Sequence, residues 1–508
     1  MDRRWLRVLS SAVGIGVLGV ALAAAGCSPE PPGKGARKEK KEKQEKNGEA
    51  ALVDWAPVPQ ALLANDAAEL ARALGQLSPA PASRGTAPDI AVIVLDTVRA
   101  DHLGVYGYGR DTSPRLDAWA EGARVYTRAY ADGPWTLPSH ASMFTGLPAR
   151  LHAARSLDLG DPRKGAPLDL AFETVPERLR AAGYATIGIA GNRAFLDPAY
   201  QLDQGFDAWL CNNLEEDTRG VAYNAADRVA PLGRAVGVRE ERPTFLFLNF
   251  MDAHTPYKAR RGYVKEPAKL VKKVIPGNKG FRKVATALMR GKPIDPGYIA
   301  SWVEAYDSEL RFVDEHVGTV LAALGEFEYV FVLADHGEYL GEHALVEHAK
   351  DVYEPVIHVP FIARGPGYAP GRDERMIQTH DLAWMVLEAA GLPVPAEMER
   401  TADLAVSELH YTLKKDLGNA DYGDRFNRVR RAYVSGAHKL IAGSDGHEER
   451  YDLALDPGED RPSASLPALF DGLDARWTAA RPERPVVPAS GSPAEPPDEQ
   501  LRALGYVE

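Results

Sequence analysis

Five predominantly apolar runs without polar alternation constrain the fold of this chain more than any other feature of its sequence. They lie at 90–95, 185–190, 245–250, 329–334 and 359–363. A strand with one face in water alternates polar and apolar residues, so a continuous apolar run indicates a strand buried on both faces. Helical stretches separate the runs, and the clearest are at 174–182 and 301–324. This alternation predicts an α/β fold, with a mostly parallel central sheet flanked by helices.

The pattern changes near Ala405. Residues 431–434 and 439–442 are typical of short antiparallel strands, and the chain from Glu459 onward is expected to be loop and tail. We therefore predict a main domain at 88–404 and a small C-terminal α+β subdomain at 405–508.

The first 27 residues have the pattern of a bacterial lipoprotein signal. Three arginines precede an apolar stretch at 8–25, and small residues lead directly to Cys27. The alternative is an uncleaved anchor, because about 18 apolar residues just span a bilayer. Either interpretation places the folded part outside the cytoplasm, in the cell envelope, on the periplasmic or extracytoplasmic face of a bacterial membrane. Residues 28–87 are expected to be a charged, Pro-rich linker, with a Lys- and Glu-rich run at 34–43.

Charge and cysteine content exclude some partners and bonds. The formal net charge is -11, which argues against nucleic acid as a general partner because phosphate backbones require clustered cations. Cys27 and Cys211 are the two cysteines. If Cys27 carries the lipid, no internal disulfide forms, and Cys211 is expected to be a small buried residue.

Carboxylates and imidazoles follow three of the predicted strands. Asp96 follows the first run, Asp252 and His254 follow the third, and Asp335 and His336 follow the fourth. The carboxyl ends of parallel strands meet at one edge of a sheet, where sites form in α/β proteins. One such aspartate is usually a turn former, but three exits of this kind indicate a functional site.

Seven motifs, in order, resemble those of the sulfatase family within the alkaline-phosphatase superfamily. They lie at 94–107, 135–146, 251–257, 306–314, 335–343, 359–361 and 451–459. The resemblance extends from about residue 88 to residue 460. It implies a metal-dependent hydrolase or transferase that acts on an anionic phosphate or sulfate ester. It leaves open a true sulfatase and a binding protein that has lost turnover.

The resemblance assigns the nucleophile to Thr136. The family signature is Cys or Ser, any residue, Pro, Ser, Arg, and its first residue is converted to formylglycine. Here Thr136 stands first and His140 replaces the arginine. Oxidation of threonine would give a ketone rather than the aldehyde. The wider superfamily uses unmodified threonine, so we expect Thr136 to act unmodified.

The resemblance also implies the metal ligands, which are Asp96, Asp335 and His336, with Thr136 completing the set. Thr97 stands where the family often has a second aspartate. An imidazole ligand and the loss of one carboxylate favour a single Mn²⁺ or Zn²⁺ over Ca²⁺, which prefers oxygen ligands.

Three further histidines match functional positions of the family. His254 and His348 resemble positions that hold the ester oxygens or protonate the leaving group. His140 stands where an arginine steadies the nucleophile. Arg99, Asp101, Glu338, Glu342 and His343 also match, and we expect them to support the loops around the site.

The segment 258–292 is strongly basic in this acidic protein, with twelve Lys and Arg against one Glu. A solvated surface loop would explain it. The alternative is a lid beside the site that attracts a polyanionic substrate or contacts anionic lipid headgroups.

Overall fold

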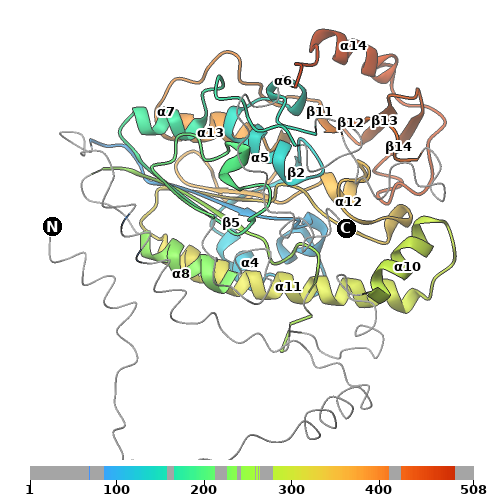
Figure 1. Cartoon of the computed structure of the whole chain (residues 1–508), viewed down its shortest axis with the longest axis horizontal. Helices are drawn as coiled ribbons and strands as arrows, with labels where there is room; N and C mark the ends of the chain where they lie inside the picture. Colours follow the sequence, from blue (N-terminus) through green and yellow to red (C-terminus); the bar gives the residue numbers. More distant parts are fainter. Residues whose placement is uncertain are drawn as a thin grey trace, which may run out of the picture.

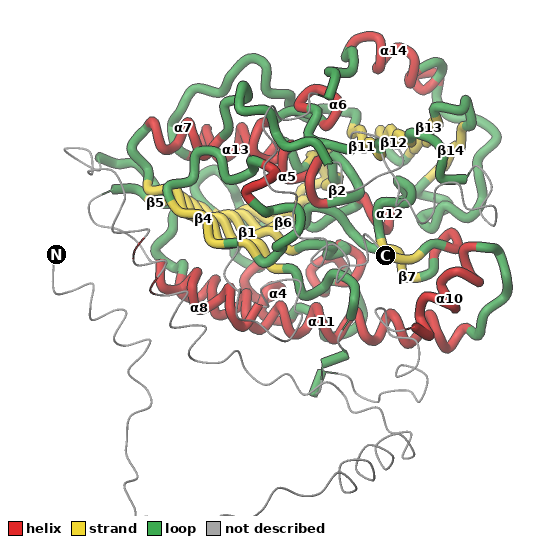
Figure 2. The backbone as a smooth tube through the Cα atoms, in the orientation of Figure 1, coloured by secondary structure: helices red, strands yellow, loops and turns green. Residues whose placement is uncertain are grey.

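A sheet of eight strands runs through the middle of the described part of the chain (Figure 2). The computed structural model describes residues 68, 72, 85–156, 165–211, 226–236, 242–257, 259–260, 262–263, 279–410 and 425–486. The strand order is β10-β2-β9-β6-β1-β5-β3-β4. Strand β9 pairs antiparallel with both of its neighbours, and the other pairs are parallel. The predicted fold class is thereby confirmed.

The strands of this sheet are β1 (Ile90–Leu95), β2 (Arg124–Tyr130), β3 (Ala185–Ala190), β4 (Ala208–Leu210), β5 (Thr244–Phe250), β6 (Tyr329–Leu333), β9 (Phe361–Arg364) and β10 (Gly371–Gln378). Every residue of β1, β3 and β5 is buried, as the continuous apolar runs predict. The run at 359–363 forms a strand only from Phe361, because Pro360 has no N–H to donate to a neighbouring strand.

Helices cover both faces of the sheet (Figure 1). The helices are α4 (Pro114–Ala120), α5 (Thr136–Thr145), α6 (Ala149–His152), α7 (Val175–Ala181), α8 (Ala226–Val236), α10 (Lys279–Met289), α11 (Pro296–Ala323), α12 (Glu354–Ile357), α13 (Asp381–Ala389) and α14 (Leu473–Ala480). Helices α4, α8 and α11 lie on one face, and α5, α7 and α13 lie on the other. This places the long helix α11 along one side of the sheet.

The predicted start of helix α7 agrees with the structure, whereas the predicted start of helix α11 does not. Thr174 caps α7 through a reciprocal pair of hydrogen bonds with Glu177, as its position predicts. Helix α11 begins at Pro296, five residues before the expected start. The Asp295 side chain accepts a hydrogen bond from the Gly297 N–H at 2.8 Å, and proline is favoured in the first turn of a helix. The pair Asp295-Pro296 therefore marks the start of the helix in the sequence.

A second, antiparallel sheet forms the small C-terminal subdomain. It contains β11 (Ala405–Leu409), β12 (Arg430–Ser435), β13 (His438–Gly443) and β14 (Glu448–Asp452). A two-stranded sheet, β7 (Tyr339–Leu340) with β8 (Val346–Glu347), lies in the loop after β6. The expectation of only loop and tail after Glu459 was wrong. Helix α14 forms there because Leu473 and Trp477, one turn apart, pack with Phe470 against the subdomain sheet.

The export signal and most of the linker were predicted on residues that lie outside the described ranges. None of the helices within those ranges is both long enough and apolar enough to cross a membrane.

Candidate active site and metal centre

Adjacent strands β1 and β6 bring Asp96, Asp335 and His336 together. The strands are parallel and in register, and their carboxyl ends carry these residues. All three side chains are fully buried. The His336 Nε2 lies 3.5 Å from the Asp335 Oδ2 and 4.0 Å from the Asp96 Oδ1. The predicted ligands therefore form one compact group that could hold a metal ion.

Thr136 approaches this group from the first turn of α5. Its Oγ1 lies 3.5 Å from the His336 Nε2. The helix begins at Thr136 itself, while Ser139 lies one turn in and donates a hydrogen bond to the Gly133 carbonyl at 2.9 Å. The partial positive charge of a helix N-terminus therefore acts on Thr136 and favours negative charge at this position.

The donor atoms fit a divalent cation. Oδ1 of Asp96 and Oδ2 of Asp335 are buried and have no hydrogen-bond partner among the described residues. The Nδ1–H of His336 donates to the Gly337 carbonyl at 2.9 Å, which leaves the Nε2 lone pair for a metal. Two carboxylate oxygens, one imidazole nitrogen and one hydroxyl suit Mn²⁺ or Zn²⁺.

Burial makes the charged carboxylates costly unless a cation is bound. Desolvation is the largest cause that raises the pKa of Asp96 to about 8, and the charge of Asp335 adds to it. Desolvation likewise raises the pKa of Asp335 to about 7. A bound cation would offset the cost of burying two negative charges.

We expect the metal-free protein to lose stability as pH rises from about 4 to about 8. The folded pKa values of Asp96 and Asp335 lie above the unfolded value of 3.8, so the folded state binds more protons across this range. Thermal unfolding in chelator should therefore show a falling Tm, and saturating Mn²⁺ should remove the fall. Asp96→Asn stays neutral and should flatten the slope in chelator. Equal slopes with and without Mn²⁺ would contradict a metal at these carboxylates.

Asn192 also belongs to the site, although the sequence analysis did not select it. Its Nδ2 donates to the Asp96 Oδ2 at 3.0 Å and to the Thr136 Oγ1 at 3.3 Å. Its Oδ1 accepts two backbone N–H groups of the following turn, which fixes the side chain. The signal was present, because Asn192 follows the buried run that forms β3 at the same sheet edge.

Thr97 supports the site through its backbone. Its N–H donates to the Asp335 Oδ1 at 3.2 Å, and its own hydroxyl donates to the Asp96 carbonyl at 2.7 Å. The hydroxyl of Tyr306, on α11, donates to the Thr97 carbonyl at 2.7 Å. Thr97 has a φ of 60°, which is strained for a β-branched residue and is held by these contacts.

Two of the predicted catalytic histidines adjoin the metal group. The His348 ring centroid lies 4.5 Å from that of His336 and 4.7 Å from that of His254. The Nδ1 of His348 lies 2.9 Å from a carboxylate oxygen of Glu338, and the His254 Nδ1 contacts the Thr255 carbonyl. Burial is the largest cause that lowers the pKa of His254 to about 3, and the neighbouring His348 contributes to this shift.

His140 lies one turn along α5 from Thr136. Its Nδ1 donates to the Thr136 carbonyl at 3.0 Å and lies 3.6 Å from the Asp335 Oδ2. Burial lowers its pKa to about 3, so the ring is neutral. The structure therefore places His140 beside the first turn that carries Thr136, where it fixes the backbone of that turn.

The expected supporting residues occupy the surrounding loops. Arg99 pairs with Asp101 and Glu342, each at 2.7 Å, and donates to the Glu338 carbonyl at 3.0 Å. These bonds tie the loop after β1 to the loop after β6. His343 stacks on Tyr353 outside this network.

Asp252 does not join the site. Its carboxylate accepts hydrogen bonds from the Arg260 guanidinium and from the Ala226 N–H at the start of α8. Arg260 also pairs with Glu309 at 2.7 Å. The segment after β5 therefore contributes His254 to the site but no carboxylate, because the carboxylate of Asp252 is paired with the buried Arg260.

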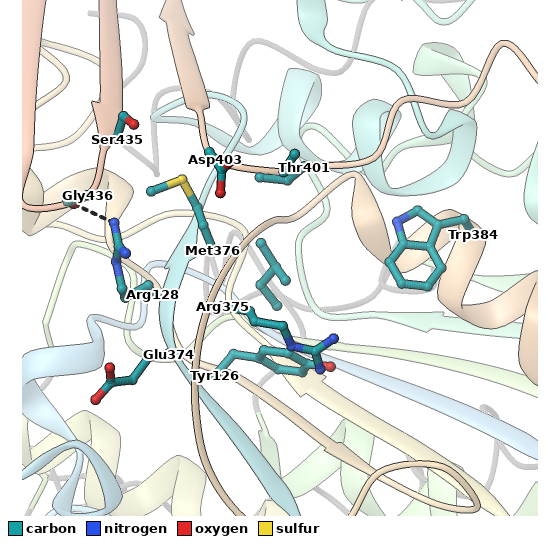
Figure 3. Close-up of a pocket in the computed structure, with 12 residues that line it drawn as sticks. Tyr126, Arg128, Glu374, Arg375, Met376, Trp384, Thr401, Asp403, Ser435 and Gly436 are labelled. Carbon is teal, nitrogen blue, oxygen red and sulfur yellow. Dashed lines mark hydrogen bonds between the residues drawn. The ribbon is translucent and has the colours of Figure 1, made fainter. Parts of the chain in front are cut away.

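Two surface cavities lie away from the metal group. One, of about 560 Å³, is lined by residues that include Tyr126, Arg375 and Ser435 (Figure 3). The other, of about 430 Å³, shares Thr401 and Ser435 with it. Neither is lined by Thr136 or the three metal-binding candidates. We therefore locate the site by its converging donor atoms rather than by cavity volume.

The family comparison decides the assignment, since the sulfatase family model matches residues 88–392. The chain belongs to the sulfatase family. Enzymes of this family use a divalent metal, and a group of side chains that could hold one, Asp96, Asp335 and His336, lies within the matched range.

Individual sulfatases resemble most of the chain at low identity. The choline-sulfatase of Rhizobium meliloti is 24% identical over 460 residues, which cover 77% of this chain and 87% of the relative. The Δ4,5-hexuronate-2-O-sulfatase of Bacteroides thetaiotaomicron is 23% identical over 433 residues, which cover 75% and 85%.

Solved structures of the family share the fold. The phosphonate monoester hydrolase of Silicibacter pomeroyi matches with a TM-score of 0.59 at 20% identity, covering 78% of this chain and 96% of that one. A 2-O GAG sulfatase matches with a TM-score of 0.58 at 18% identity, covering 78% and 91%. At these identities the structures establish the fold and leave the substrate open.

Proposed function

We propose that this sulfatase-family protein is a metal-dependent hydrolase of phosphate or sulfate esters that uses unmodified Thr136 as its nucleophile. One observation carries the proposal. The unpartnered oxygens of Asp96 and Asp335 and the Nε2 of His336 converge beside the Thr136 hydroxyl. A binding protein without turnover would not require a hydroxyl at this point.

The metal would be held by Asp96, Asp335 and His336, with Thr136 beside them. When bound, a divalent cation lowers the pKa of an adjacent hydroxyl and offsets negative charge on the ester. Asn192 can orient the Thr136 oxygen through its 3.3 Å hydrogen bond. The N-terminus of α5 favours negative charge on that oxygen as the hydroxyl proton leaves.

The reaction would proceed in two displacements. The Thr136 hydroxyl would give its proton to solvent, its oxygen would form a bond to phosphorus or sulfur, and the bond to the leaving oxygen would break. His254 and His348 are our candidates to give the leaving oxygen a proton, because their rings adjoin that of His336 or each other and an anionic ester beside them would raise their pKa values. Water then attacks the threonine ester, which releases the inorganic anion and returns a proton to the Thr136 oxygen.

A substrate panel tests this proposal and its alternatives. Nitrophenyl phosphate, nitrophenyl sulfate, a phosphate diester and a phosphonate monoester should be assayed with added Mn²⁺ or Zn²⁺. Turnover of any of them that is lost in chelator supports the hydrolase. Higher turnover when an alcohol acceptor is added would make the protein a transferase. Tight binding of the esters without turnover would favour the inactive binding protein.

We also propose that Cys27 carries a lipid that holds the enzyme at a bacterial membrane. The basic n-region, the apolar stretch and the small residues before Cys27 support this. We expect Cys27→Ala to move the enzyme from the membrane fraction to the soluble fraction, or to leave it as an unprocessed precursor. Membrane association and lipid labelling that match the parent chain would rule out this anchor.

A further inference from the structure

The basic segment predicted at 258–292 is divided in the structure. Arg260 is buried and paired with Asp252 and Glu309, so it belongs to the core. Lys258, Arg261, Lys265, Lys269, Lys272 and Lys273 lie outside the described residues. The expectation of a solvated loop or a lid for this segment stays a prediction from the sequence.

A buried carboxylate that the mechanism does not use lies four residues before Thr136. This is Asp132, which follows β2 and accepts four hydrogen bonds from the end of β10 and the two residues after it. The Nδ1–H of His380 donates to its Oδ1 at 2.6 Å, and the His380 backbone N–H donates to its Oδ2 at 2.8 Å. The Thr379 hydroxyl donates at 2.7 Å and the Gln378 Nε2 at 3.3 Å. These bonds fix Asp132 against the start of α13.

Asp132 and His380 form a buried ion pair. Burial by itself would lower the pKa of His380, but the charge and hydrogen bond of Asp132, together with the charges of Asp381 and Glu399, raise it to about 9. The ring is therefore charged at neutral pH. Removal of one partner of such a pair leaves the other charge buried without compensation.

The backbone at Asp132 is held on both sides. Its N–H donates to the Thr379 hydroxyl at 3.1 Å, and its carbonyl accepts the Glu408 N–H of β11 at 2.9 Å. Two residues later, the Pro134 carbonyl accepts the Ala349 N–H at 3.1 Å. Ala349 directly follows His348, so these contacts join the segment after β2 to one of the candidate catalytic histidines.

The segment from Asp132 to Thr136 is short and closely packed. Four residues span at most about 14 Å of extended chain. A Cβ at Gly133 would lie 3.2 Å from the Glu408 carbonyl oxygen and 3.3 Å from the Pro138 Cγ, so the backbone lies tightly between β11 and α5. A shift of Asp132 would therefore move the first turn of α5, which carries Thr136.

We propose that the buried Asp132–His380 pair is a positioning device that holds the Thr136 oxygen beside the metal group. This inference rests on the proposed function for the role of Thr136. Asp132 and His380 act through the backbone of the segment between Asp132 and Thr136, so they are positioning residues rather than catalytic ones. A displacement of a reacting group by about 1 Å can lower the rate about a hundredfold.

The test compares Asp132→Asn with a matched control in the full-length, Mn²⁺-loaded protein. Asn keeps the size of the side chain but turns one accepting oxygen into a donor, which opposes the donors around it. The control is Asp89→Asn. Asp89 is also buried and accepts the Thr244 N–H at 2.6 Å, but it precedes β1 and so lies at the opposite end of that strand from Asp96.

Three properties are measured below the Tm of both variants. They are kcat and KM for the best ester, the metal content, and the hydrogen exchange of the peptide that spans residues 131–140. We expect Asp132→Asn to lower kcat by about tenfold to a hundredfold and to change KM by less than about threefold. Its metal content should match that of the parent, and exchange in the peptide should be at least about threefold faster.

The control should keep kcat and the exchange of this peptide within about twofold of the parent, even where its Tm falls, because distant sites act independently. Equal losses of kcat in the two variants would overturn the proposal, since they would report a general loss of stability. So would an Asp132→Asn protein with the kcat and exchange of the parent.

Variants of the partner residue decide the question if Asp132→Asn does not fold. His380→Ala removes one of the four hydrogen bonds and leaves Asp132 in place, and it should lower kcat by about tenfold. His380→Asn puts an amide donor where the ring Nδ1 stood and should restore kcat to within about threefold of the parent. A His380→Ala protein with the kcat of the parent would reject the pair.

The exchange measurement separates this inference from the proposed function, because it needs no turnover. If the parent hydrolyses no ester of the panel, the proposed function fails, and exchange in the 131–140 peptide still shows whether Asp132 holds the segment. Conversely, hydrolysis that depends on Thr136 but keeps its kcat in Asp132→Asn would leave the function intact and reject the positioning pair.

Discussion

Replacement of Thr136 by alanine is expected to lower turnover of the best ester in the panel by about 10³-fold or more. The substitution removes the oxygen that lies 3.5 Å from the His336 Nε2 and leaves the rest of α5 unchanged. Metal content and thermal stability should stay close to those of the parent. Initial rates at saturating substrate measure the effect.

Two companion variants make the Thr136 result specific. Thr136→Ser keeps a hydroxyl and should stay within about tenfold of the parent. Asn192→Ala keeps the nucleophile but removes its amide donor, and it should lose about tenfold to a hundredfold. If the alanine, serine and parent proteins turn over at the same rate, Thr136 is not the nucleophile.

The second large effect is expected from the double variant Asp335→Ala, His336→Ala. It removes two of the three candidate ligand side chains, and the remaining Asp96 carboxylate cannot hold a divalent cation tightly by itself. Protein purified without chelator should fall from close to one Mn or Zn per chain to nearly none. Turnover should fall to background with it.

A matched variant controls for the loss of one acid and one imidazole. Asp471→Ala, His447→Ala removes the same groups outside the metal set, from exposed positions of the C-terminal subdomain. Its metal content should match that of the parent. A parent protein that contains only calcium, or a double variant that keeps its Mn or Zn, would reject the proposed centre.

The sequence predicted the parts of the fold that follow from burial on both faces. The runs at β1, β3, β5 and β6 stand out because the middle of a parallel sheet excludes polar side chains. Strands β2 and β10 were not predicted. Strand β10 is an edge strand with several exposed charged residues, so it has no continuous apolar run.

The ends of the predicted strands and the order of the motifs were enough to predict the metal-binding candidates and the nucleophile. Asp96, Thr136, Asp335 and His336 meet as expected. The pairing of Asp252 with Arg260 was not predictable, because the contact between these two side chains depends on the folded structure. Asn192 was missed for a simpler reason, because an asparagine after a strand usually marks a turn.

The most direct measurement is the mass of the peptide that contains Thr136, isolated from enzyme that is quenched in acid during turnover. We expect a fraction of this peptide to carry one added phosphoryl or sulfuryl group on Thr136. The peptide from resting enzyme should have the unmodified mass of threonine. A transferred group on a different residue, or a modified Thr136 in the resting enzyme, would contradict the account.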